Sequence, residues 1–337
     1  MGVPADEQRA LVLALGRMGL LERDETPEFA ELTGGVSSRI VRARTARGQV
    51  CVKRALPRLK VEKEWTAPVE RNGAEVGWLR IASEVVPGLV PPVLGEDPES
   101  GSFAMAYLDP SAFPVWKSLL RDGTILPATA AAIGRAIVAI HASTAGSPKV
   151  ASAFANDSTF DALRLNPYLM TTAAVHPDCA AALIGLSATT ASTRRALVHG
   201  DVSPKNILVG GGGPIILDAE CAWYGDPAFD LAFCLNHMLL KCVWRPHWTR
   251  RYLDCFDALT DAYLEGVRWE DPAGLESRAA RLLPGLMLAR IDGKSPVEYI
   301  TLEPDRDRVR RFSRERLFNP GATLRQIRSE WEIERES

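Results

Sequence analysis

"LVHGDVSPKNILVGGGGPIILDAE", residues Leu197–Glu220, is the part of this 337-residue chain with the densest chemical signals. It carries His199, Asp201, Asn206 and Asp218 among short apolar runs that are separated by polar or glycine-rich turns. The runs "NILVG" and "PIILDAE" predict two strands joined by the glycines. A second strand that returns beside the first places the Asp218 carboxylate next to Asn206, so we expect these side chains to converge.

The composition is that of an ordinary folded protein. Hydrophobic residues make up 46% of the chain and charged residues 24%, far from the balance typical of disorder. The length exceeds that of one typical domain. The chain could hold either one large domain or two lobes. We expect two lobes, residues 1–108 and 109–337, because the last strand-like run of the first part ends near Asp109.

The charge balance excludes some classes of partner. A formal net charge of -2 creates no overall field that attracts nucleic acid or an anionic membrane. The N-terminal stretch has no basic region before its apolar part, and no apolar window reaches the length of a membrane span. The six cysteines form no CxxC pair and are expected to be reduced and buried. We expect a cytoplasmic protein, monomer or homodimer, that binds neither nucleic acid nor membranes.

Hydrophobic periodicity divides the chain into a strand-rich first part and a helix-rich remainder. In the first part we expect a helix near 5–21, antiparallel strands within 29–56, a helix over 60–84 that Pro68 kinks or divides, and strands at 90–97 and 101–109. Before the Leu197–Glu220 segment, helices are expected at 127–144 and around Ala181. After it, helices are expected at 229–240, 248–264 and 276–290.

The residue types in the opening segment suit transfer of a nucleotide γ-phosphoryl group to a hydroxyl. That reaction needs an acceptor for the hydroxyl proton, hard oxygen ligands for Mg²⁺, and a cation over the phosphates. Asp201 and Asn206 project from one tight loop, and Asp218 ends the returning strand. Each is either a proton acceptor or a metal ligand by its chemistry alone.

"HGDVSPKNIL" followed by "IILDAE" resembles the catalytic and metal-binding loops of the aminoglycoside phosphotransferase and choline kinase-like family, relatives of protein kinases. The resemblance implies an α+β, two-lobed protein kinase-like fold, with a small antiparallel sheet in the N-lobe and a mainly helical C-lobe. It implies ATP and Mg²⁺ as cofactors. It also implies that Asp201 is the catalytic base and that Asn206 and Asp218 hold Mg²⁺.

The resemblance extends upstream and implies that residues 1–108 form the nucleotide-binding lobe. "VCVKRA" resembles the family's strand with a phosphate-contacting lysine, here Lys53, and Glu75 is the best candidate for its ion-pair partner. The alternatives to Glu75 on the same predicted helix are Glu62, Glu64, Glu70 and Glu84. "LTGGVSSRIVRART" resembles the phosphate-covering hairpin, with contacts from Gly34, Gly35 and Ser37 or Ser38. "FAMAYLD" resembles the segment between the lobes, where backbone groups of Ala106, Tyr107 and Leu108 meet adenine and Met105 lines the pocket.

Downstream, "WYGDPAFDLAFCL" resembles the family's segment in which aspartates brace the active-site loops, here Asp226 and Asp230. Whether Lys205, four residues after the base, reaches a phosphate stays open. Arg290 and its neighbours could touch the substrate, but a solvated helix end is the favoured interpretation. "DAE" stands where protein kinases have "DFG", and Gly200 stands where they favour arginine, which favours a small-molecule kinase.

We therefore expect an ATP-dependent phosphotransferase that acts on a hydroxyl of a small molecule: a metabolite, an amino alcohol, a sugar or an antibiotic. After Ala219, acidic and basic residues are roughly balanced, which argues against a polycationic aminoglycoside. Two other classes stay in view: a catalytically silent, nucleotide-binding pseudokinase and a protein kinase. The first is disfavoured because the lysine, base and metal ligands are all present, and the second because no long segment follows Asp218 before the next expected helix.

Overall fold

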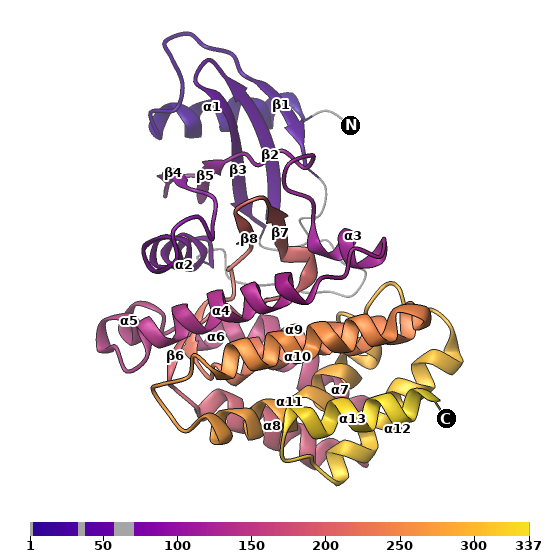
Figure 1. The fold of residues 1–337 in the computed structure, drawn as a ribbon. Coiled ribbons are helices and arrows are strands. Elements are labelled where there is room, and N and C mark those ends of the chain that lie inside the picture. The colour runs from indigo at the N-terminus through magenta and orange to yellow at the C-terminus, as the bar shows by residue number, and fades with distance from the viewer. Residues whose placement is uncertain (1–2, 33–37, 57–70, 337) are drawn as a thin grey trace.

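The computed structural model describes residues 3–32, 38–56 and 71–336. Figure 1 shows a small part built on a sheet above a larger part built of helices. The sheet has five antiparallel strands in the order β1-β2-β3-β5-β4. The strands are β1 (Glu28–Glu31), β2 (Ser38–Thr45), β3 (Gly48–Ala55), β4 (Val93–Asp97) and β5 (Ser102–Ala106). The strands expected from the period of two in the sequence are thus present.

Strand β3 is buried on both faces. Because successive side chains of a strand point to opposite faces, the sequence position of Lys53 decides which way its side chain points. Val50 and Val52 pack with Leu11 and Leu15 of α1 (Ala5–Arg17) in a small cluster on one face. Cys51, on the opposite face, belongs to the main core that includes α2 (Arg71–Val85). Lys53 has the same parity as Cys51, so its side chain points toward α2 rather than toward α1.

Helix α2 corresponds to the second half of the helix expected over 60–84. The described helix begins at Arg71, and the expected kink at Pro68 lies outside the described residues. The N-terminal helix expected over 5–21 ends at Arg17, because Gly19 adopts a left-handed backbone with φ of 70°.

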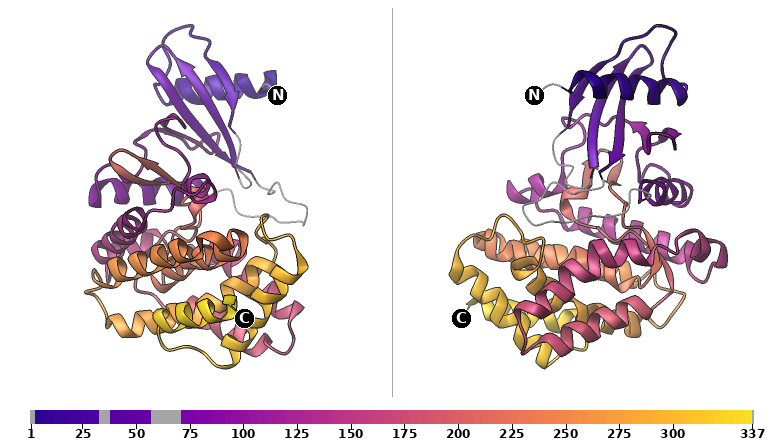
Figure 2. Two further views of the ribbon diagram at one scale, coloured as in Figure 1. Left: turned by 45° about the vertical axis from the view of Figure 1, so that its right-hand side comes forward. Right: turned by 180° about the vertical axis from the view of Figure 1, so that it is seen from behind.

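The larger part is helical, and α9 lies at its centre. Every residue of α9 from Ala228 to Val243 is buried, which is the pattern of a helix surrounded by protein on all sides. Its neighbours α10 and α11 pack on it, as Figures 1 and 2 show from several sides. The α-helices here are α3 (Trp116–Arg121), α4 (Pro127–Thr144), α5 (Pro148–Ala153), α6 (Asp157–Phe160), α7 (Thr171–Val175), α8 (Ala180–Ser192), α9 (Ala228–Trp244), α10 (Thr249–Leu264), α11 (Pro272–Asp292), α12 (Glu303–Phe318) and α13 (Leu324–Glu336).

The larger part also contains two short antiparallel ribbons. They are β6 (Ala196–Val198) with β9 (Trp223–Gly225), and β7 (Ile207–Gly210) with β8 (Gly213–Ile216). The β7–β8 hairpin is the one predicted from the glycine run. Three further helical segments are not α-helices. They are the π-helix η1 (Asp161–Met170) and the 3₁₀ segments η2 (Pro204–Asn206) and η3 (Pro246–Trp248).

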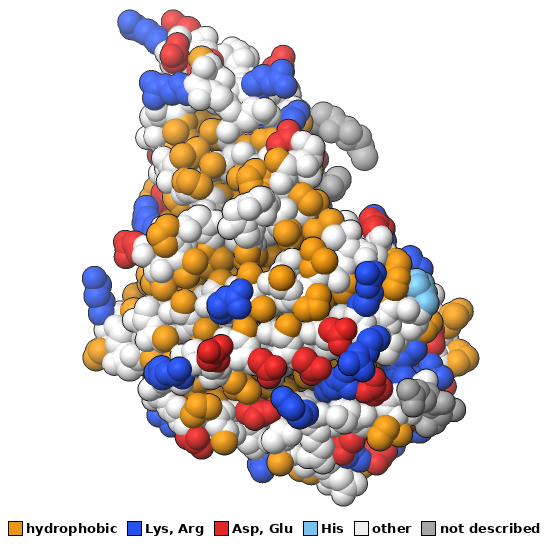
Figure 3. Space-filling model, viewed as in Figure 1, with side chains coloured by type: hydrophobic (Ala, Val, Ile, Leu, Met, Phe, Trp, Pro, Cys, Tyr) orange, Lys and Arg blue, Asp and Glu red, His pale blue; other side chains and the backbone are white. Residues whose placement is uncertain are grey.

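The surface matches this arrangement. Figure 3 shows apolar side chains gathered around the junction between the two parts, with charged side chains of both signs over the helical part. Among the described residues, no helix combines the length and the apolar character that crossing a membrane requires. All six cysteines are buried and free, as expected.

Helix α1 is tied to the sheet by an ion pair whose strength depends on pH. Arg17 donates from Nε to Asp97 Oδ1 at 2.9 Å and from Nη2 to Oδ2 at 2.6 Å. The Arg17 hydrogen bond, helped by Ser100 and opposed by burial, lowers the pKa of Asp97 to about 2. The pair therefore stabilises the fold fully above the unfolded aspartate pKa of about 4 and loses that contribution as pH falls toward 2.

We predict that Arg17→Ala lowers the urea midpoint at pH 7 and that the difference from the wild type shrinks as pH falls from 4 to 2. Arg9→Ala, which changes an exposed arginine of the same helix, is the matched control and leaves the midpoint unchanged. A difference between Arg17→Ala and the wild type that stays constant over this pH range contradicts the role of the pair.

Candidate active site

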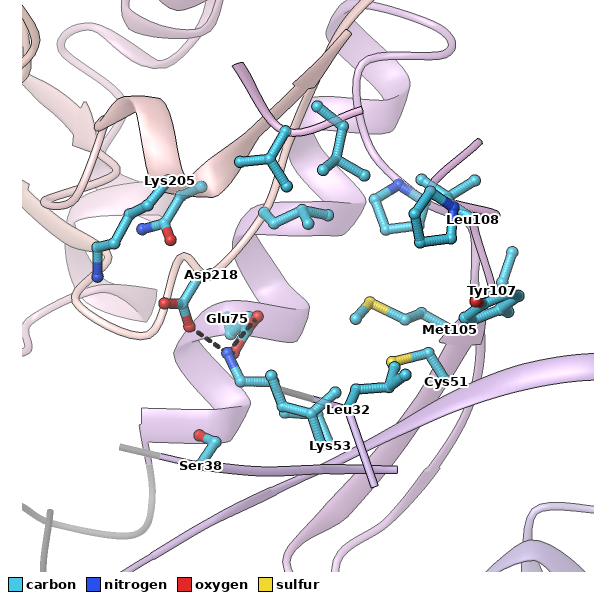
Figure 4. A pocket seen from close by; sticks show the side chains of 18 residues that line it. Leu32, Ser38, Cys51, Lys53, Glu75, Met105, Tyr107, Leu108, Lys205 and Asp218 are labelled. Carbon is cyan, nitrogen blue, oxygen red and sulfur yellow. Dashed lines mark hydrogen bonds and ion pairs between the residues drawn. The ribbon is translucent and has the colours of Figure 1, made fainter. Parts of the chain in front are cut away.

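A cavity of about 430 Å³ lies between the sheet and the helical part. Figure 4 shows side chains from both parts pointing into it. Of the residues expected at the site, the cavity is lined by Ser38, Lys53, Glu75, Met105, Ala106, Tyr107, Leu108, Asn206 and Asp218. Gly34, Gly35 and Ser37 lie outside the described residues. Asp201 is not one of the residues that line the cavity. Its carboxylate lies 3.1 Å from Nζ of Lys205, which does line it.

Lys53 forms the centre of a buried ion-pair network. Its Nζ lies 2.9 Å from Glu75 Oε1 and 2.7 Å from Oε2, and it also donates to Asp218 Oδ1. Figure 4 shows the ammonium between the two carboxylates. The network joins β3, α2 and the segment after β8, three elements that are far apart in sequence. Of the five glutamates considered as partners, Glu62, Glu64 and Glu70 lie outside the described residues. Of the two that are described, Glu75 and Glu84, Glu75 is the one in contact with Lys53.

Burial and charge act against one another in this network. Burial lowers the pKa of Lys53, but the charges of Asp218 and Glu75 outweigh it and raise the pKa well above the ordinary value. Burial raises the pKa of Glu75 above its ordinary range, against the attraction of Lys53. Asp218 has the opposite shift, because Lys53 and Lys205 outweigh its burial and lower its pKa. Lys53 and Asp218 are therefore charged at neutral pH.

The hairpin β7–β8 brings Asp218 to Asn206. The N–H of Leu217 donates to the carbonyl of Asn206 at 2.8 Å, so the residue that precedes Asp218 pairs with Asn206. Asp218 itself has a φ of 68°, a left-handed conformation that costs energy for a residue with a Cβ. Such strain is concentrated at functional sites, and here it turns the carboxylate toward Lys53.

Asp201 is buried and held by two cations. Arg164 Nη2 lies 2.9 Å and Lys205 Nζ 3.1 Å from the same oxygen, Oδ2. Burial raises the pKa of Asp201, but Arg164 and Lys205 outweigh it, so the pKa lies below the ordinary value. Arg164 also donates to the carbonyls of Gly200 and Leu163. Asp201 thus stays ionised, with Oδ1 free of protein hydrogen bonds among the described residues.

The backbone of the Asp201 loop is fixed by Asp230 of α9. Its carboxylate accepts the N–H of His199 at 2.7 Å and of Gly200 at 2.8 Å. Gly200 has a φ of 81°, and a Cβ there would lie 2.9 Å from the carbonyl oxygen of Cys221. No residue with a side chain fits this position, which explains the absence of the arginine that protein kinases favour.

Asp230 therefore braces the loop as expected from the sequence, whereas Asp226 does something else. Asp226 accepts the N–H of Ala228 at 3.1 Å, at the start of α9, and forms an ion pair with Arg278 of α11 at 3.0 Å. It joins two helices rather than the active-site loop.

Two further residues of the site had no signal in the sequence. Arg164 lies in the π-helix η1, an element that single-sequence patterns do not distinguish from an α-helix. Arg71, at the start of α2, donates from Nε to Glu220 at 3.0 Å and gives the third residue of "DAE" a buried partner. The expectation of a solvated helix end around Arg290 is wrong, because Arg290 is only 9% exposed.

We predict that the two cations on Asp201 differ in their contribution to stability. Arg164→Met leaves a buried carboxylate with a single, half-exposed partner and lowers the free energy of unfolding by about 3–5 kcal/mol. Lys205→Met, the matched control on the same oxygen, costs at most about 1 kcal/mol, because its ammonium is solvated. Urea denaturation of the two variants measures both values, and equal losses contradict the assignment of Arg164 as the main partner.

Solved structures share the fold. The chain resembles a choline/ethanolamine kinase family protein from Mesorhizobium loti with a TM-score of 0.55 and 18% identity, over 98% of this chain and 99% of that one. It resembles an ethanolamine kinase from Plasmodium vivax with a TM-score of 0.58 and 13% identity, over 95% and 88% of the two chains. The two-lobed kinase-like fold expected from the sequence is confirmed.

Curated relatives are more similar in sequence. A methylthioribose kinase of Pectobacterium carotovorum subsp. carotovorum is 28% identical over 232 residues, 61% of this chain and 58% of the relative. One from Geobacillus thermodenitrificans is 28% identical over 284 residues, 74% and 69% of the two chains. The alignment thus spans little more than half the length of the first relative.

The family comparison covers the sheet, the cavity and the helices as far as α10. The model of the phosphotransferase enzyme family (APH) matches residues 28–265, which contain Lys53, Glu75, Asp201, Asn206 and Asp218. This chain belongs to the phosphotransferase enzyme family.

Proposed function

We propose that this protein transfers the γ-phosphoryl group of ATP to a hydroxyl group of a small molecule. The observation that supports it best is the convergence of Lys53, Asn206 and Asp218 on one cavity, with Asp201 behind it. A cavity of about 430 Å³ is of the size that small-molecule sites have. The relatives named methylthioribose kinase act on a small molecule, which supports the same class of acceptor.

The apolar end of the cavity suits a nucleotide base. Met105, at the end of β5, faces the cavity with Cys51 and Leu208, and Tyr107 and Leu108 continue the chain along its edge. In our proposal, adenine lies between these side chains and its edge meets backbone groups after β5.

At the polar end, Lys53 is the cation for the phosphates. Its ammonium is fixed by Glu75, so little conformational freedom is lost when it contacts an anion. Charge of this kind, fixed in advance in a site of low dielectric, is worth more than the same charge in water.

The residues present fit Mg²⁺. The Asn206 amide donates to the backbone carbonyl of Asp201 at 3.1 Å, which leaves its oxygen as a ligand, and Asp218 keeps one carboxylate oxygen free of hydrogen bonds with described residues. Among the described residues no cluster of three or more His, Cys, Asp or Glu side chains could hold a metal, so substrate phosphates and water would supply the remaining ligands. Bound there, Mg²⁺ supplies charge neutralisation on the phosphates.

Asp201 is the proposed base. Its Oδ2 is occupied by Arg164 and Lys205, so Oδ1 is the oxygen that accepts the proton of the substrate hydroxyl. The two cations keep the carboxylate ionised and orient it.

The segment after Asp218 supports a small acceptor rather than a protein. Helix α9 begins at Ala228, only ten residues later, and β9 occupies part of the interval. This leaves no room for the long activation loop on which a protein substrate would dock.

We predict that Asp201→Asn lowers kcat for phosphate transfer by about 10²–10⁴-fold while ATP binding is retained, because the general base is lost and the nucleotide contacts are not. Mass spectrometry of a metabolite and antibiotic panel, incubated with Mg-ATP, identifies the acceptor and then measures the rate. Asp161→Asn, at an exposed carboxylate, is the control with an unchanged rate. Unchanged turnover in Asp201→Asn would falsify its role as the base.

We predict that Asp218→Asn weakens Mg²⁺-dependent nucleotide binding by about tenfold or more, equivalent to about 1.4 kcal/mol. The substitution removes the charged metal ligand and keeps the shape of the side chain. Titration with a fluorescent ATP analogue, with and without Mg²⁺, measures the gain in affinity that the metal provides. The same gain in the variant and the wild type contradicts Asp218 as a ligand.

A further inference from the structure

Three basic side chains meet in the interior of the helical part, where α9 and α11 lie side by side (Figure 1). His237 and Lys241 are one turn apart on α9, and Arg290 comes from the last turn of α11. Their exposed fractions are 6%, 1% and 9%. We call these three residues the basic cluster. Buried charges of one sign are costly unless a counter-charge is near.

Lys241 has no carboxylate partner among the described residues. Its ammonium lies 5.1 Å from the centre of the Trp244 ring and 4.7 Å from that of Tyr299, and the two rings stack on each other at 4.5 Å. Burial, together with the charge of Lys117, lowers the pKa of Lys241 to about 7.

Arg290 is likewise held only by neutral groups in the described part of the chain. Its Nη1 donates to the Tyr168 hydroxyl at 3.3 Å and to Ser295 Oγ at 3.0 Å, as well as to the Ser295 carbonyl. Its Nε is enclosed and has no hydrogen-bond partner among the described residues. Glu298, a carboxylate near Arg290 and Lys241, is paired with Lys117 of α3.

The ring of His237 makes no hydrogen bond with the described residues, and it packs on Phe233 at 5.8 Å. Burial, then the charges of Arg290, Lys241, Lys205 and Lys117, hold the pKa of His237 well below its ordinary value. The main charges that act on this histidine are thus cations, while Glu298 is a carboxylate that acts on Lys241.

Aromatic rings connect the basic cluster to the arginine that binds the proposed base. Arg164, which binds Asp201, lies 5.9 Å from the ring of Tyr168 and 5.7 Å from that of Phe233. The ring of Tyr168 also lies 5.8 Å from the guanidinium of Arg290. The ring of Tyr168 is therefore a neighbour both of the arginine that holds the proposed base and of one arginine of the cluster.

We propose that the basic cluster of Lys241, Arg290 and His237 binds an anionic group of the phosphate acceptor, so that the acceptor is a small hydroxylated carboxylate or phosphate ester. This inference rests on the proposed function. A bound anion supplies the counter-charge that the cluster lacks. A cationic acceptor would be repelled by the cluster. The Trp244–Tyr299 pair, which could otherwise attract a cation, already has the ammonium of Lys241 beside it.

The test uses two readouts on the full chain. Thermal shift without ATP measures binding of gluconate, ribose 5-phosphate, inorganic phosphate, glucose, glucosamine and methylthioribose. Mass spectrometry with Mg-ATP measures phosphorylation of the same hydroxylated compounds. We expect at least one organic anion to stabilise the wild type and to be phosphorylated, and we expect its apparent affinity to fall by tenfold or more in Lys241→Met.

Lys241→Met also separates a binding role from a structural one. Because it removes a buried charge without a partner and keeps the apolar stem, the ligand-free variant is expected to melt at the same or a higher temperature than the wild type. Lys149→Met, at an exposed lysine of α5, is the control for both readouts. Arg290→Gln is the second variant and retains hydrogen-bonding groups for Ser295 and Tyr168.

The outcomes are distinguishable. Stabilisation by an anion that depends on Lys241 supports the inference even if no phosphate is transferred, in which case the proposed function fails alone. Phosphorylation of glucose, glucosamine or methylthioribose with a KM that Lys241→Met leaves unchanged overturns the inference and leaves the proposed function standing. An absence of any Lys241-dependent stabilisation by the anions also overturns it.

Discussion

The buried ammonium of Lys53 is the interaction on which the site depends. It is bound to carboxylates from two other parts of the chain, Glu75 of α2 and Asp218 after β8. Removing the ammonium of Lys53 would leave the carboxylate of Glu75 buried without its partner, at a cost of several kcal/mol. The sheet, α2 and the β7–β8 hairpin are therefore fixed relative to one another at this point. A second buried pair, Arg71 with Glu220, ties the start of α2 to the same segment.

The polar groups of the cavity are already fixed in position by the protein itself, so that binding a ligand need not rearrange them. Asp230 fixes the loop of Asp201 through two backbone N–H groups, and Arg164 fixes the carboxylate itself. The left-handed backbone at Asp218 stores strain that the Lys53 ion pair compensates. The surrounding core is densely apolar, with α9 buried along its whole length, so these positions have little freedom to relax.

Local patterns were sufficient for much of this arrangement. Alternation placed Lys53 on a strand, the glycine run implied the β7–β8 hairpin, and the spacing of Asp201, Asn206 and Asp218 implied their convergence. The helix register around Glu75 was less certain, since four other glutamates were alternatives. Between the two that the structure describes, Glu75 and Glu84, the packing of α2 against β3 selects Glu75. Arg164 left no trace in the sequence pattern, because Asp201 is distant from it in sequence and only the fold brings the two side chains together. Arg290 was assigned to a solvated helix end because a basic residue near a helix terminus usually is solvated, whereas the chain that follows α11 covers it here.

Sequence alone was enough for the fold class, through the family that its motifs resemble, and for the set of groups suited to phosphoryl transfer. Both depend on short-range features, the motifs themselves and the spacing within one loop. Tertiary structure alone decided which charges are paired and which are not. Lys53, Arg164, Lys241 and Arg290 are all basic side chains in apolar surroundings, and nothing local distinguishes them. The first two meet carboxylates from distant segments, and the last two meet none among the residues that the structure describes. Pairing in a protein interior depends on which elements the fold brings within a few ångströms.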